Sequence, residues 1–110
     1  MAWNTVYVLI EPVTQAHLAS VGDESLFRVA QQKLARYGEG SDPEQQQFDF
    51  WDPDTFKIVT GIAEEDWPPM GIINRDSEWI DPACSSFNEA TAQVKNPRPT
   101  ERVVVVSCHY

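Results

Sequence analysis

Four consecutive valines, Val103 to Val106, limit the possible folds of this chain more than any other feature. Successive side chains of a β-strand point to opposite faces of the sheet, so a strand over Arg102–Tyr110 is apolar on both faces. The stretch Thr5–Ile10 is similar, because it is β-branched and aromatic and ends at Glu11-Pro12. We therefore expect two buried strands, one near each end of the chain.

Two helices are expected between these strands. The first spans about residues 14–37, with a break near Gly22, because apolar residues between Leu26 and Tyr37 recur at the spacing of one helical face. The second begins with Asp81 as its N-cap and runs to about Val94.

A hairpin is expected in the middle of the chain. Phe48 and Phe50 belong to its first strand, and alternating residues from Phe56 to Ile62 form its second strand. The turn formers of Asp52–Thr55 connect the two strands. Met70–Ile73 is expected to add a short edge strand.

The order strand, helix, strand, strand, helix, strand is typical of an α+β fold. It predicts a split βαβ (ferredoxin-like) sandwich, in which both helices pack on one face of an antiparallel sheet. At 110 residues the chain has the size of one domain, residues 1–110. Since the second sheet face would be open, we expect a homodimer or the segment Trp67–Ile73 to cover it. We also expect a mobile acidic loop at about 38–47 and an acidic connector at about 63–70.

The charge of the chain is distributed unevenly. Seventeen acidic and eight basic residues leave a net charge of −9. Residues 39–81 contain twelve of the acidic residues, two of the basic residues and six of the twelve aromatic residues. The overall negative charge repels phosphate backbones and anionic lipids, so we expect neither a nucleic acid nor a membrane as a partner.

Aromatic side chains in an acidic field are typical of a surface that binds a basic protein. The charge speeds association, and the aromatic residues supply affinity once they are buried. We expect a small binding protein without a cofactor, acting as a stoichiometric inhibitor or immunity-type protein that covers a basic surface. The competing interpretation is that the aromatic residues belong to the core and the acidic residues only confer solubility. The expected contact residues are Asp49, Trp51, Asp52, Asp54, Glu64, Glu65, Asp66 and Trp67.

Cys84 is the centre of an alternative, catalytic or ligand-binding interpretation. In the first turn of the second helix, free backbone N–H groups would stabilise its thiolate, with His17 or His109 as the base. An aromatic-lined pocket near Cys84 would then hold a small ligand. However, Asp81 opposes a thiolate there, and an inert buried cysteine is more common. Cys108 and His109 are adjacent on a strand, so they point to opposite faces.

No metal site is expected. An EF-hand count that starts at Asp52 places Lys57 where the loop requires a glycine, so Asp49, Asp52 and Asp54 make a poor calcium loop. Two cysteines are too few for a disulfide framework. The first residues lack the basic stretch of a signal peptide, and the apolar run Val6–Ile10 is too short to cross a bilayer. These features predict a cytoplasmic protein with reduced thiols.

Overall fold

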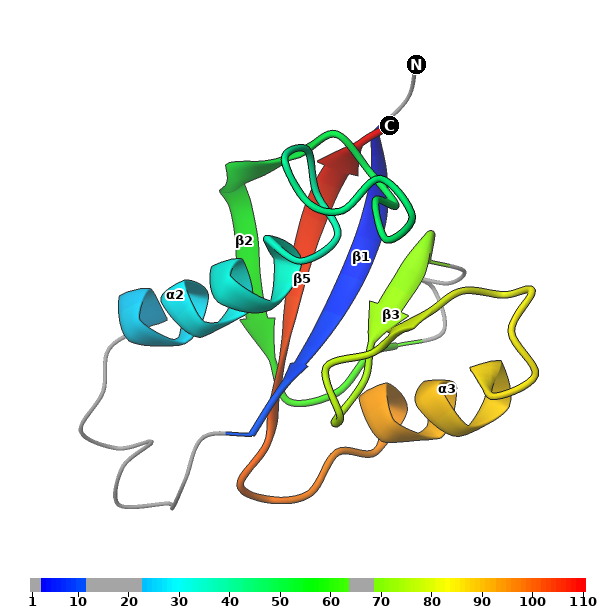
Figure 1. The fold of residues 1–110 in the computed structure, drawn as a ribbon. Helices are drawn as coiled ribbons and strands as arrows, with labels where there is room; N and C mark the ends of the chain where they lie inside the picture. The colour runs from blue at the N-terminus through cyan, green and yellow to red at the C-terminus, as the bar shows by residue number, and fades with distance from the viewer. Residues whose placement is uncertain (1–2, 12–22, 64–68) are drawn as a thin grey trace.

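The computed structural model describes residues 3–11, 23–63 and 69–110 (Figure 1). These residues form an α+β domain with one five-stranded sheet in the order β2-β5-β1-β3-β4. The elements are β1 (Trp3–Ile10), α2 (Asp23–Leu34), β2 (Phe50–Val59), β3 (Gly71–Ile73), β4 (Trp79–Ile80), α3 (Phe87–Lys95) and β5 (Arg102–His109). The two strands expected to be buried, β1 and β5, are neighbours at the centre of the sheet.

The sheet is mixed, so the expectation of a purely antiparallel sheet is wrong. β1 pairs antiparallel with β5 along its full length, but it pairs parallel with β3. β3 was expected at an edge, yet it lies between β1 and β4. A three-residue strand has too few alternating positions to indicate its direction or its neighbours. The ferredoxin-like split βαβ arrangement is not confirmed.

α2 covers one face of the sheet. Leu26, Ala30 and Leu34 pack in one buried cluster, the α2 cluster, with Val6 and Val8 of β1. The predicted helical face is therefore present, although the helix ends earlier than predicted. The predicted residues 14–22 lie outside the described part of the chain.

α3 covers the opposite face, so the expectation of both helices on one face is wrong. Ala90 and Val94 of α3 pack with Tyr7, Leu9 and Val103 in a second buried cluster, the α3 cluster. Both faces of β1 and β5 are apolar, and each face is buried against its own helix. The predicted homodimer is not tested by a single chain. The segment Trp67–Ile73 lies partly outside the described residues.

β2 replaces the expected hairpin. Phe50–Asp52 and Lys57–Val59 both pair antiparallel with β5, and the register shifts between Asp52 and Lys57. Thr55 closes the resulting bulge, because its Oγ1 donates to the Asp52 carbonyl at 2.7 Å and accepts from the Ser107 N–H at 2.9 Å. The turn formers of Asp52–Thr55 therefore form a bulge within one strand, because the residues on both sides of the bulge pair with the same strand, β5.

Candidate functional site

An acidic loop, residues 38–49, lies beside the start of β1 and the end of β5 (Figure 1). Hydrogen bonds tie its two ends to each other and to the sheet. The Glu39 N–H donates to the Asp49 carbonyl at 2.7 Å, and the Asp49 N–H donates to the His109 carbonyl at 2.7 Å. The loop, which connects α2 to β2, is therefore closed at its base, as in other compact surface loops. Its predicted mobility stays a prediction.

Phe48 fixes this loop to the core. The side chain is only 2% exposed, and its ring centroid lies 6.0 Å from that of Trp79. A Cβ at Gly38 would lie 3.1 Å from the Phe48 ring, so a glycine lets the loop begin close to that ring. Tyr37, just before the loop, donates from its hydroxyl to the Ser77 carbonyl at 2.6 Å. The acidic loop is thus supported by buried aromatic residues.

Six carboxylates form the acidic surface of this region. Residues 39–54 contain no lysine, arginine or histidine. Four of the six residues are exposed and two are partly buried. The six are Glu39, Asp42, Glu44, Asp49, Asp52 and Asp54. A cationic partner is therefore attracted to this surface, and an anionic one is repelled.

An aromatic row crosses three strands next to the acidic surface: Trp3 of β1, His109 of β5 and Phe50 of β2. The strand register places Trp3 and Phe50 directly opposite His109. The His109 ring is stacked on Phe50, with 4.8 Å between centroids and 6° between planes, and its centroid lies 5.2 Å from that of Trp3. Even so, Trp3 is 51% exposed and Phe50 47% exposed. Two large rings are therefore held in place with about half of their surface in solvent.

Asp49 connects the acidic surface to the aromatic row. Its Oδ2 lies 3.3 Å from Nδ1 of His109, which is an ion pair when the imidazole is protonated. The described contacts of His109 are with Asp49, Phe50 and Trp3. This arrangement orients the imidazole, but it brings no nucleophile to it.

The cysteines do not join this site. Cys84 precedes α3, which begins only at Phe87, so the expected support of a thiolate by the helix N-terminus is wrong. The reason is that Asp81 accepts the Ala83 N–H at 2.8 Å and forms a turn instead of capping a helix. Cys84 packs with the α3 cluster, and its Sγ lies 3.6 Å from Oδ1 of Asp81. It therefore forms no pair with His109.

Cys108 is fully buried among the α2 cluster, and burial raises the pKa of its thiol to about 12. It lies in the α2 cluster while His109 belongs to the aromatic row, as expected for adjacent residues of a strand. Both cysteines are free thiols. His17 lies outside the described residues.

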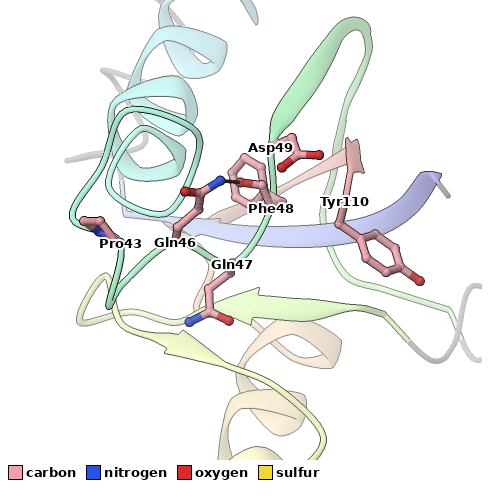
Figure 2. Close-up of a pocket in the computed structure, with 6 residues that line it drawn as sticks. All are labelled: Pro43, Gln46, Gln47, Phe48, Asp49 and Tyr110. Atoms are coloured by element: carbon pink, nitrogen blue, oxygen red, sulfur yellow. Dashed lines mark hydrogen bonds between the residues drawn. The ribbon is translucent and has the colours of Figure 1, made fainter. Parts of the chain in front are cut away.

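Two pockets share Asp49 as a lining residue. The first, of about 280 Å³, is lined by Pro43, Gln46, Gln47, Phe48, Asp49 and Tyr110 (Figure 2). In Figure 2 the Gln46 side chain lies against Phe48, and its Nε2 donates to the Phe48 carbonyl at 3.2 Å. The second pocket, of about 320 Å³, is lined by Glu39, Gly40, Asp49, Phe50 and Trp51. Cys84 lines neither pocket, so the aromatic-lined pocket expected near it is not one of these two.

The predicted contact residues are partly brought together. Asp49 and Trp51 line the second pocket, whereas Asp52 and Asp54 lie further along β2. Trp51 also packs against the α2 cluster, so it belongs in part to the core. The acidic connector about 63–70 is described only at its ends, and four predicted contact residues lie outside the described part. These four are Glu64, Glu65, Asp66 and Trp67.

Phe50, Trp3 and Tyr110 were not among the contact residues predicted from the sequence. Phe50 was assigned only to a strand of the hairpin, whereas Trp3 and Tyr110 were not singled out. Tyr110 is 49% exposed and lines the first pocket. Both residues stand at the ends of strands that were predicted correctly, and Trp3 precedes the apolar run of β1. An aromatic residue just outside a buried run was the available signal, because such a residue extends the strand without belonging to its core.

The described residues show neither a metal site nor a membrane-spanning helix. Among residues 3–11, 23–63 and 69–110, no three histidine, cysteine, aspartate or glutamate side chains gather as a metal site. Neither helix in that part of the chain is long and apolar enough to cross a membrane. Comparisons with protein-family models, curated proteins and solved structures found no match.

Proposed function

We propose that this protein acts by binding a basic partner protein through the acidic surface and the aromatic row. The observation that carries the proposal is the aromatic row, in which the Trp3 and Phe50 rings contact each other and His109 yet are about half exposed. A partner that buries such rings gains affinity, because aromatic residues dominate binding energy at protein interfaces. The neighbouring carboxylates steer a basic partner to these rings.

The charge of the surface favours a basic protein over the other possible partners. A nucleic acid is repelled by six carboxylates, and a second copy of the chain would bring two acidic surfaces together. A basic surface on a nucleic-acid-binding enzyme is a suitable target, because an acidic protein bound there excludes the phosphate backbone. An inhibitor or immunity-type protein would act in this way. No chemical step is needed for it.

The proposal is tested by comparing two charge reversals as baits in a lysate of the source organism. Glu44→Lys/Asp54→Lys changes the acidic surface, and neither side chain makes a hydrogen bond or an ion pair among the described residues. Glu24→Lys/Glu89→Lys is the matched control, because it changes the net charge equally at exposed positions on α2 and α3. We expect a basic protein that the unmodified chain and the control retain at low salt and release at high salt, and that the first variant does not retain.

The aromatic row is then tested with the captured protein. Phe50→Ala is expected to weaken binding by about 30-fold, chiefly through faster dissociation, as for a central interface residue. The charge reversals are expected to slow association instead. Equal retention of every protein by all baits would show that the interface lies elsewhere. Thermal unfolding of each variant checks that the fold is retained.

A further inference from the structure

The imidazole of His109 is enclosed by the aromatic row. Phe50 stacks on it with 4.8 Å between ring centroids, and the Trp3 ring meets it at 71° with 5.2 Å between centroids. The Trp3 and Phe50 rings also contact each other, with 5.6 Å between centroids. The His109 side chain is therefore only 16% exposed, although both rings that cover it are about half exposed.

Asp49 is the only charged group among the described contacts of this imidazole. β1 contributes Trp3, β2 contributes Phe50, and the acidic loop contributes Asp49, whose Oδ2 lies 3.3 Å from Nδ1 of His109. The preceding residue of β5, Cys108, packs in the α2 cluster on the other face of the sheet. Within the described part of the chain, a proton on the imidazole is therefore balanced by one carboxylate.

Asp49 also forms the base of the acidic loop. Its backbone N–H donates to the His109 carbonyl at 2.7 Å, and its own carbonyl accepts from the Glu39 N–H at 2.7 Å. The carboxylate beside the imidazole thus belongs to the residue that closes the loop. A change of charge on His109 therefore acts on two parts of the surface, the exposed rings and the acidic loop.

Histidine side chains change their charge between about pH 5 and pH 8. Protonation of His109 places a positive charge beside the rings that a partner would bury, and this charge compensates that of Asp49 in an ion pair. Both effects weaken the attraction of the surface for a basic protein. We propose that His109 is a pH switch of this surface, which binds a basic partner while the imidazole is neutral and releases it when the imidazole is protonated. For the identity of its partner, the inference rests on the proposed function.

The switch is tested first in the free protein, by NMR titration of the full chain between about pH 8 and pH 5. We expect the indole N–H of Trp3 and the backbone amides of Glu39 and Asp49 to shift together with the imidazole of His109. His109→Gln is expected to abolish these shifts. His17→Gln removes the other histidine of the chain and is the matched control, which should keep them. Equal shifts in the His109→Gln variant would overturn the switch.

Asp49→Asn tests the connection to the loop with a second variant. It keeps the shape of the side chain and removes its charge, so the Glu39 amide is expected to lose most of its shift while the Trp3 indole keeps its own. An unchanged shift at Glu39 would show that the carboxylate does not connect the imidazole to the loop. Thermal unfolding shows whether each variant is folded.

Release is then measured with the captured basic protein. Between about pH 7.5 and pH 5.5, the dissociation rate is expected to rise by about tenfold for the unmodified chain and for His17→Gln, and by less than about twofold for His109→Gln. Titrating groups of the partner are the same in all three measurements, so the difference between the variants belongs to His109.

The outcomes separate this inference from the proposed function. If a basic protein is captured in a salt-sensitive way but dissociates with the same pH dependence from His109→Gln, the switch is overturned and the proposed function stands. If the Trp3 and loop signals follow His109 in the free protein while all charge-reversal baits behave alike in the lysate, the response of the surface to His109 is supported and the proposed function fails.

Discussion

At the scale of single residues, Glu101 is the one fully buried carboxylate among the described residues. Arg75 donates to its two oxygens from Nε at 2.5 Å and from Nη2 at 2.8 Å, and the Arg98 N–H donates to Oε1 at 2.7 Å. Burial alone would raise the pKa of Glu101, but the hydrogen bonds from Arg75 and Arg98 outweigh it and hold the pKa below its usual value. The pair fastens the turn after β3 to the start of β5.

This pair makes stability depend on pH. Because the pKa of Glu101 is lower in the folded state, its charge stabilises the fold above the unfolded pKa, and this stabilisation is lost as the pH falls through the folded pKa. Glu101→Gln is expected to lower the free energy of unfolding by about 3 kcal/mol at neutral pH, since it leaves Arg75 without its partner. Urea unfolding at neutral and acidic pH should show a smaller difference in acid. A difference that does not change with pH would contradict this account, and the exposed Glu89→Gln serves as the control.

At the scale of elements, the hairpin of β3 and β4 depends on one close contact. A Cβ at Gly71 would overlap the indole ring of Trp79, so only a glycine allows this ring to lie across β3. The same ring lies 5.7 Å from that of Tyr37 and 6.0 Å from that of Phe48, measured between centroids. Through Trp79, the hairpin of β3 and β4 therefore supports Phe48, the residue that fixes the acidic loop to the core.

Gly71→Ala is expected to lower the free energy of unfolding by about 1–3 kcal/mol, because Trp79 must move. In the background of Trp79→Leu, where the overlap is relieved, the same change should cost much less. A double-mutant cycle by urea unfolding measures this coupling. If the two substitutions lower the free energy of unfolding additively, the contact between Gly71 and Trp79 does not limit the packing.

At the scale of the whole molecule, the uneven charge and the two covered sheet faces argue against self-association. α3 buries the face that a homodimer was expected to cover, and the exposed rings that remain lie beside six carboxylates. A symmetric contact through this surface would place like charges opposite each other.

The chain is therefore expected to sediment as a monomer of 12.5 kDa at neutral pH and low salt, over a wide range of concentrations. Analytical ultracentrifugation measures this directly. A dimer that dissociates in Trp3→Ala but not in the matched surface change Val29→Ala would make the aromatic row an interface between copies of this chain. That result would contradict the proposed basic partner.

What could be predicted from the sequence was local. Alternation and helical spacing identified β1, β5 and the apolar face of α2, and the excess of acidic over basic residues in 39–81 indicated an acidic region in the middle of the chain. These properties depend on neighbours a few positions apart, because the periods of a strand and a helix are short.

The tertiary structure alone decided the direction of β3, the opposite placement of the two helices and the single strand β2 in place of a hairpin. It also decided the aromatic row, since Trp3, Phe50 and His109 meet only through the register of three strands that are far apart in the sequence. Register follows from long-range pairing and the burial of whole faces, and no local pattern encodes it. For this reason the sequence by itself determined the acidic charge of the candidate site, and the fold determined which aromatic residues stand beside it.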